Sequence, residues 1–368
     1  MSKAVVPKLF QPVKVGQHWL GHRVVLAPLT RYRANKAHVH GDLAVTYYGQ
    51  RATVPGTLLI SEATFISAKA GGFDNVPGIW NDEQVAGWKR VTDEVHDKGS
   101  RIFCQFWALG RAATSSVLDR EGLPYVSSGD KILTGRKRNP RPLTIPEIKE
   151  YIDMYRNAAR CAVLAGFDGV ELHGANGYLI DQFTQDVTNN RTDEYGGSVE
   201  NRCRFALEVI DAVVSTIGAD KTGIRLSPWG QFQDMLMDDP KPTFSYLVSQ
   251  IAERHPDFAY IHVVEPRAQG NVDRDVQPGE SNGFLRDIWR PRAYISAGGY
   301  SRETAFEDAD KYGDLIAFGR LFIPNPDLPL RLAKDLPIVE GGRDLYYLPE
   351  EPHGYIDYPF SDDPKANL

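Results

Sequence analysis

A histidine, an asparagine and a tyrosine lie close together in the chain, as His173, Asn176 and Tyr178. Side chains three residues apart face the same way on a helical turn, so His173 and Asn176 can both donate a hydrogen bond to one oxygen atom. Tyr178 adds a weak acid, ordinarily with a pKa near ~10, that can give a proton to a carbanion. The cluster therefore predicts a catalytic site that holds a carbonyl oxygen and protonates a nearby carbon.

A metal site is the competing interpretation of a histidine at the end of an apolar run. No second histidine or acid follows at the spacing of metal ligands, which favours carbonyl polarisation over a metal. The three cysteines, Cys104, Cys161 and Cys203, form no C-x-x-C pair and are odd in number. We expect no metal and no disulfide, and a metal-dependent barrel hydrolase is the less favoured alternative.

Two other pairs of residues have the character of a phosphate site. Gly298 and Gly299 end one short apolar run, and Gly319 and Arg320 end the next. Bare backbone N–H groups and a guanidinium suit a dianion, and barrel enzymes commonly hold a phosphate after their last two strands. Together these four residues predict phosphate binding.

Gln105 and Arg225 stand inside apolar runs, where a barrel interior usually has Val, Ile or Leu. One interpretation is an internal hydrogen-bonded pair. The favoured one is a planar ligand at the barrel mouth: Gln105 meets a pyrimidine edge as donor and acceptor, and Arg225 stabilises negative charge on a reduced ring.

The elements that position these residues alternate between short apolar runs and longer amphipathic ones. Eight strands are expected, at 24–28, 57–63, 101–107, 169–173, 222–228, 260–266, 293–299 and 315–320. Helices are expected at 42–52, 81–98, 144–165, 198–217, 244–254, 284–288, 302–311 and 328–334. Eight β–α alternations without a long linker predict an α/β fold, a (β/α)8 TIM barrel, as one domain over 1–368.

Three segments lie outside this alternation. Residues 8–25, with Gly16 and Gly21, predict an N-terminal hairpin that caps the barrel bottom. Residues 112–141 and 267–282 are polar and predict long loops over the C-terminal face, where barrel enzymes have their active sites.

The overall composition narrows the partners. The chain has 368 residues, a formal net charge of -6 and a pI of about 5.9, which argues against nucleic acid because phosphate binding needs a basic patch. No apolar run is long enough to span a membrane, and none marks the N-terminus for secretion. We expect a cytoplasmic enzyme with a small-molecule substrate. The oligomeric state is left open.

A series of motifs along nearly the whole chain resembles the old yellow enzyme family. The matching segments are 27–31 (APLTR), 105–107 (QFW), 173–183 (HGANGYLIDQF), 190–198 (NRTDEYGGS), 225–228 (RLSP), 318–320 (FGR) and 353–359 (HGYIDYP). Such a series in order is far more specific than any one motif.

The resemblance implies an FMN-binding barrel that NADPH reduces. The residues it implies for FMN contact are Pro28, Leu29, Thr30, Ala63, Gln105, His173, Arg225, Gly298, Gly299, Gly319, Arg320 and Tyr347. Thr30 would bond the flavin C4 carbonyl, and FMN N5 would give hydride to the β-carbon of an activated double bond. His173 and Asn176 would hold the substrate carbonyl, and Tyr178 would protonate the α-carbon.

Within the family the chain resembles the fungal branch of ergot alkaloid biosynthesis that acts on chanoclavine-I aldehyde. Tyrosine at position 178 resembles the reductases of that branch, whereas phenylalanine there is typical of its isomerases. Ala63 and Gln233 depart mildly from the family pattern, and residues 267–282 match it poorly. The alternatives are a broad-specificity reductase of enones or oxylipins and a non-catalytic flavin-binding protein.

Overall fold

The apolar runs form a closed barrel of eight parallel strands in the computed structural model, which describes residues 6–270 and 272–361. The strands are β3 (Val24–Leu26), β4 (Leu58–Ile60), β6 (Arg101–Trp107), β9 (Gly169–Gly174), β10 (Thr222–Leu226), β11 (Tyr260–Val264), β14 (Tyr294–Ala297) and β15 (Leu315–Phe318). Neighbours in the barrel follow chain order, and pairing of β15 with β3 closes the ring. The short β5 (Thr64–Phe65) extends the sheet beside the end of β6.

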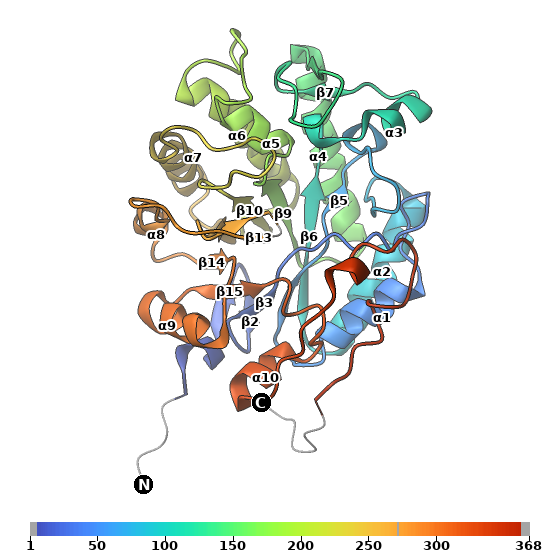
Figure 1. The fold of residues 1–368 in the computed structure, drawn as a ribbon, viewed down its shortest axis with the longest axis vertical. Helices are drawn as coiled ribbons and strands as arrows, with labels where there is room; N and C mark the ends of the chain where they lie inside the picture. The colour runs from blue at the N-terminus through green and yellow to red at the C-terminus, as the bar shows by residue number, and fades with distance from the viewer. Residues whose placement is uncertain (1–5, 271, 362–368) are drawn as a thin grey trace.

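A helix follows each barrel strand and packs outside it (Figure 1). These helices are α1 (Asp42–Arg51), α2 (Asp82–Asp97), α4 (Ile145–Leu164), α6 (Val199–Ile217), α7 (Lys241–Arg254), α8 (Gly283–Trp289), α9 (Arg302–Tyr312) and α10 (Leu328–Lys334). The predicted capping box at the start of α4 is present, because Thr144 and Glu147 bond reciprocally. The prediction of a (β/α)8 barrel is confirmed.

Two apolar cores lie on opposite sides of the barrel wall. The outer one fills the space between strands and helices. The inner one includes Phe103, Tyr260, Ile295 and Leu315 from the strands, with Val15 and Leu20 from the N-terminal hairpin. The lower half of the barrel is therefore a packed apolar plug, on which anything polar higher in the barrel must rest.

The hairpin expected at the barrel bottom is β1 (Val13–Val15) paired with β2 (His18–Leu20). Gly16 turns the hairpin with φ +54°, and a Cβ there would lie 1.9 Å from the backbone oxygen of Asp220. The turn therefore needs glycine both for its conformation and for its contact with the barrel.

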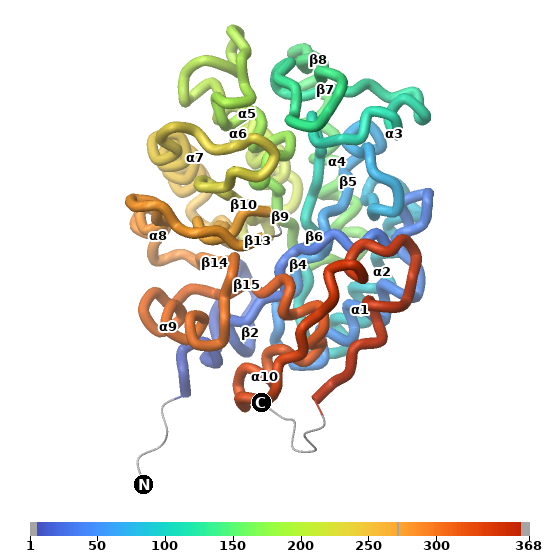
Figure 2. The backbone as a smooth tube through the Cα atoms, viewed as in Figure 1, coloured from blue at the N-terminus to red at the C-terminus, as the bar shows by residue number. Residues whose placement is uncertain are grey.

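The two segments expected as long loops contain short regular elements. Residues 112–141 include α3 (Ser115–Arg120) and the paired β7 (Val126–Ser127) and β8 (Arg141–Pro142), which Figure 2 shows side by side. Residues 267–282 include the antiparallel strands β12 (Ala268–Gln269) and β13 (Val272–Asp273). Elements of two residues have no periodicity to read, so the sequence could not reveal them.

The tail after α10 returns to the barrel mouth. Arg31, just after β3, donates to the backbone oxygens of Tyr346 (3.1 Å) and Gly354 (2.7 Å), and Arg33 also donates to Tyr346 (2.8 Å). In Figure 1 this tail, in red, runs beside α1 and α2. These bonds bring the aromatic residues 346 and 347 to the open end of the barrel.

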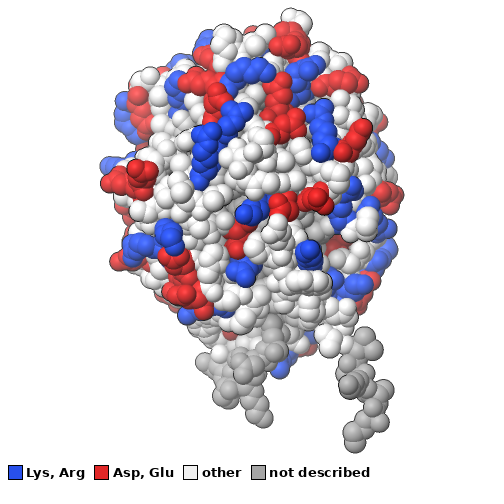
Figure 3. All heavy atoms as spheres, turned by 180° about the vertical axis from the view of Figure 1, so that it is seen from behind, with Lys and Arg blue, Asp and Glu red and all other residues white. Residues whose placement is uncertain are grey.

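The surface and the thiols agree with the composition. Lys and Arg are interspersed with Asp and Glu on the face in Figure 3, without a broad patch of one charge. In the described part of the chain, none of the helices has the length and apolarity to cross a bilayer. Cys104, Cys161 and Cys203 are free and buried.

Candidate active site

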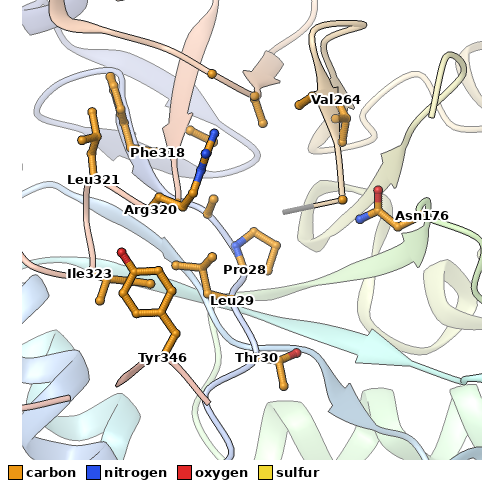
Figure 4. Close-up of a pocket in the computed structure, with 18 of the residues that line it drawn as sticks. Pro28, Leu29, Thr30, Asn176, Val264, Phe318, Arg320, Leu321, Ile323 and Tyr346 are labelled. Atoms are coloured by element: carbon orange, nitrogen blue, oxygen red, sulfur yellow. The ribbon is translucent and has the colours of Figure 1, made fainter. Parts of the chain in front are cut away.

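A cavity of about 680 Å³ opens at the carboxyl ends of the barrel strands. Every residue predicted for the site lines it: Pro28, Leu29, Thr30, Ala63, Gln105, His173, Asn176, Tyr178, Arg225, Gly298, Gly299, Gly319, Arg320 and Tyr347. In Figure 4, Asn176 reaches in from the side opposite Ile323 and Tyr346, with Pro28 and Leu29 between them. The geometry brings the predicted residues together, and their individual roles stay predictions.

His173, in β9 near its end, is a neutral hydrogen-bond donor. Its Nδ1 accepts from the N–H of Ala175 (3.4 Å), which leaves the proton on Nε2. Burial, followed by the positive charge of Arg225, holds the pKa of His173 well below its ordinary value. The side chain can therefore donate to a carbonyl oxygen, and it does not act as a cation.

Asn176 stands in a left-handed turn, with φ +57°. The turn is held on both sides, because the N–H of Asn176 donates to Ser227 Oγ (2.8 Å) and its carbonyl accepts from Gln233 Nε2 (2.7 Å). Asparagine tolerates this conformation better than most residues do. The predicted helical turn linking positions 173 and 176 is wrong: β9 ends at Gly174 and the next helix begins only at Leu179. The left-handed turn brings the two side chains to one cavity instead.

Tyr178 lies between two aromatic rings. Its ring makes edge contacts with Trp107 (4.8 Å between centroids) and His173 (4.7 Å). Burial raises the pKa of Tyr178 above its ordinary value, and Tyr32 and Tyr347 add to the rise. The positive charge of Arg225 and then a hydrogen bond with Gln233 oppose it. The hydroxyl therefore keeps its proton and is available as a proton donor at neutral pH.

Asp181 supports the turn from below. It lies in the short helix α5 (Leu179–Thr184), where its carboxylate accepts from the N–H of Gly177 (2.9 Å) and from Gln185 Nε2 (2.8 Å). Burial raises the pKa of Asp181 to about 7. The segment that carries Asn176 and Tyr178 thus rests on an acid that titrates near neutrality.

Beneath the cavity, Gln105 is bonded to a residue that the sequence analysis did not single out. Its Nε2 donates to Glu171 Oε1 (2.7 Å), and Glu171 Oε2 is 2.8 Å from His262 Nδ1. All three side chains are buried. The interpretation of Gln105 and Arg225 as a bonded pair is therefore wrong, because Gln105 bonds to Glu171. Alternation along β9 could have found Glu171, which is two residues before His173 and so faces the same way.

Arg225 forms the middle of a row across three strands, paired in register with His173 on β9 and His262 on β11. Among the described residues, Nε of Arg225 is buried without a hydrogen-bond partner. Burial lowers the pKa of this guanidinium, and the negative charge of Glu171 offsets only part of that effect. A buried donor without a partner, at the wall of a cavity, is what a ligand with acceptor atoms would satisfy.

At the other end of the cavity lie the four residues predicted for a phosphate site, together with Asp273, which was not predicted. Gly298 and Gly299 have φ +114° and +61°, a backbone that only glycine adopts readily. Arg320 forms an ion pair with Asp273 of β13, and both side chains are partly exposed. Asp273 was missed because it lies in the segment expected to be an irregular loop.

The residues present fit FMN. Gln105 offers its amide oxygen to a pyrimidine edge, Arg225 has an unpartnered buried donor, and Gly298, Gly299 and Arg320 offer backbone N–H groups and a guanidinium to a phosphate. In the described part of the chain, no group of three or more His, Cys, Asp or Glu residues could hold a metal ion. The donor set suits a flavin mononucleotide better than a metal.

Comparison with known proteins agrees with this geometry. The model of the NADH:flavin oxidoreductase / NADH oxidase family matches residues 8–338. A chanoclavine-I aldehyde reductase of Penicillium roqueforti is 52% identical over 359 residues, which cover 96% of each chain. A probable inactive reductase of Epichloe festucae var. lolii is 45% identical over 96% of each chain. Similarity therefore extends both to a named reductase and to a relative described as inactive.

The fold has close counterparts among solved structures. The old yellow enzyme of Pichia sp. superposes with a TM-score of 0.89 at 37% identity, covering 97% of this chain and 95% of the other. The barrel, and not one local motif, is thus what the two proteins share.

Proposed function

The chain belongs to the NADH:flavin oxidoreductase / NADH oxidase family, and from this premise we propose that it is an FMN-dependent ene reductase. Its substrate would be an α,β-unsaturated aldehyde, with chanoclavine-I aldehyde as the first candidate and NADPH as the reductant. The observation that carries the proposal is the convergence of a carbonyl-binding pair, His173 and Asn176, with the proton donor Tyr178 at one cavity.

Each side chain has one task in this proposal. The Nε2–H of His173 and the amide of Asn176 hold the aldehyde oxygen, and this contact polarises the conjugated double bond. The chemistry that FMN would supply, once bound, is hydride transfer to the double bond. Tyr178, protonated at neutral pH, gives its proton to the α-carbon, so that the double bond is saturated.

Support for the alkaloid aldehyde comes from the 52% identity with the Penicillium roqueforti reductase. The Epichloe relative described as inactive makes a direct assay of activity necessary. We also propose a cytoplasmic location, as expected from the sequence, and an activity that depends on NADPH agrees with it.

The test is reoxidation of the purified, FMN-loaded protein after anaerobic reduction with NADPH. Chanoclavine-I aldehyde should reoxidise the flavin faster than cyclohexenone does, and the product should be the saturated aldehyde or its cyclised amine. Preference for cyclohexenone would favour a broad enone reductase, and no reoxidation by either compound would favour a flavin-binding protein without ene reductase activity. Parallel reduction with NADH tests the choice of nicotinamide.

Tyr178→Phe separates reduction from isomerisation. Without its hydroxyl, the ring remains to pack against Trp107 and His173, but the proton donor is lost. The expected result is a loss of saturated product of about 100-fold, the usual scale of acid catalysis, with isomerised substrate in its place. Unchanged saturated product would show that Tyr178 is not the donor.

A further inference from the structure

Glu171 is a carboxylate enclosed in the middle of the barrel. Its side chain is fully buried, it rests on the apolar plug that contains Phe103 and Tyr260, and it does not line the cavity above. A buried carboxylate is costly unless hydrogen bonds and a nearby positive charge compensate for it. An aliphatic residue would complete the plug more cheaply, so the acid at this position calls for an explanation.

Glu171 interacts with Tyr260 of the plug on one side and with residues of the cavity wall on the other. One carboxylate oxygen accepts from Gln105 Nε2 (2.7 Å), and the other is 2.8 Å from His262 Nδ1. Arg225 lies on β10, between the strands of Glu171 and His262, and the negative charge of Glu171 raises the pKa of Arg225 against the effect of burial. The nearest cavity-lining side chains connected to Glu171 are therefore Gln105 and Arg225.

We propose that Glu171 is a positioning residue for the flavin: it orients the Gln105 amide and offsets the charge of Arg225 beneath the ring. The proposal rests on FMN binding, which is part of the proposed function, and it is independent of the substrate that the protein reduces.

The orientation follows from the chemistry of a carboxylate, which can only accept hydrogen bonds. Because Glu171 accepts from Gln105, the NH2 group of that amide must face down into the barrel. The amide oxygen of Gln105 is then left as the acceptor toward the cavity. A flavin N3–H is a donor, so the amide is oriented for it before the ligand binds.

The charge of Glu171 should change the reduction potential of the flavin in one direction. Reduction adds negative charge to the ring, which the guanidinium of Arg225 stabilises and the carboxylate of Glu171 opposes. His262 donates from Nδ1 to the carboxylate, and burial lowers the pKa of its imidazole, so it adds no charge of its own. Removing the charge of Glu171 leaves Arg225 uncompensated and makes the bound flavin easier to reduce.

The experiment compares Glu171→Gln with wild type in two measurements, the reduction potential of bound FMN and its dissociation constant. An isosteric amide removes the charge and allows Gln105 to rotate. We expect the reduction potential of bound FMN to rise by about 30 mV. For a two-electron couple this is a tenfold shift in the equilibrium between oxidised and reduced flavin. FMN affinity should fall about tenfold, the loss of one hydrogen bond of this kind.

The matched control is Asp327→Asn, which also removes a buried, hydrogen-bonded carboxylate. Asp327 lies outside the cavity and accepts from Arg331 Nε (2.6 Å). The control should leave both FMN measurements at their wild-type values, whatever it does to the melting temperature. A melting-temperature loss in Glu171→Gln with unchanged potential and affinity would overturn the proposal, because it would show a purely structural role.

Glu171→Asp decides the question if the amide variant does not fold. It keeps the charge but withdraws the carboxylate by one methylene, so the potential should stay near wild type while FMN affinity falls. Wild-type affinity in this variant would overturn the proposal. The proposed function fails separately, if wild-type protein binds no FMN or does not reduce the aldehyde.

Discussion

The floor and the rim of the cavity handle charge in different ways. The floor consists of Gln105 and Arg225, which line the cavity, with Glu171 and His262 buried behind them, and barrel strands hold all four residues. The rim pair, Arg320 and Asp273, is partly exposed to solvent, with Asp273 on a strand of two residues. The buried hydrogen bonds of Glu171 with Gln105 and His262 resist rearrangement because breaking them would leave further polar groups unpaired, whereas an exposed ion pair contributes little and exchanges easily. The floor is therefore preorganised for its ligand, and the rim is not.

The largest of these effects is expected on FMN affinity, from a substitution in the floor. Arg225→Leu removes a guanidinium at the cavity wall whose buried Nε has no partner among the described residues. Bonds to charged groups contribute about 2 kcal/mol, so FMN affinity should fall about 30-fold. The dissociation constant is measured by titrating FMN with the apoprotein and recording the quenching of the FMN fluorescence. Arg225→Lys, which keeps the charge without the fork of donors, should recover only part of the loss, and wild-type affinity in the leucine variant would contradict the idea of a preorganised floor.

The next largest effect is expected on catalysis, at Asn176, which lines the cavity beside the proposed position of the substrate carbonyl. Asn176→Gly and Asn176→Ala both remove the amide, so both should lower kcat/KM for the enal by about tenfold, as for one lost hydrogen bond. Only alanine strains the left-handed backbone at φ +57°, which should cost about 1 kcal/mol of stability. Steady-state kinetics and thermal unfolding separate these contributions. Equal stability of the two variants would argue that the turn stores no strain.

Asp181 tests how firmly the catalytic turn is supported at different pH. Burial raises its pKa to about 7, above the ordinary value of a carboxyl group, so the folded state favours the protonated form. Its contribution to stability is complete below about pH 4, where the unfolded chain is also protonated, and is lost as the pH rises through 7. The stability of wild type should therefore decline over this range relative to Asp181→Asn. Parallel curves for the two proteins between pH 4 and 8 would be the contrary result.

The smallest effect is expected at the rim. Asp273→Asn frees Arg320 from its carboxylate partner, so the guanidinium is available to the FMN phosphate. An exposed pair contributes about 0.5 kcal/mol, so affinity should rise only about twofold, and less in high salt. Asp275→Asn, a neighbouring acid on the same segment, is the matched control. A large gain or loss in Asp273→Asn alone would mean that the rim is as preorganised as the floor.

The predicted fold and cavity could be read from the sequence for particular reasons. Strands buried on both faces are near-continuous apolar runs, and polar residues at their ends, such as His173 and Arg225, stand out against that background. Glu171 and His262 were overlooked because attention to strand ends passes over the strand interior. Asp273 was overlooked because a strand of two residues has no pattern.

The barrel, its eight strands and the polar residues at the strand ends could be predicted from the sequence alone, because period and spacing are local properties of the chain. The partners of those side chains could be known only from the folded barrel. Gln105 bonds to Glu171 and not to Arg225, and Arg320 pairs with Asp273. The tail reaches the mouth through Arg31, more than 300 positions away in the chain. Such contacts depend on how the barrel closes, and closure joins residues whose distance in the sequence carries no information about their distance in space.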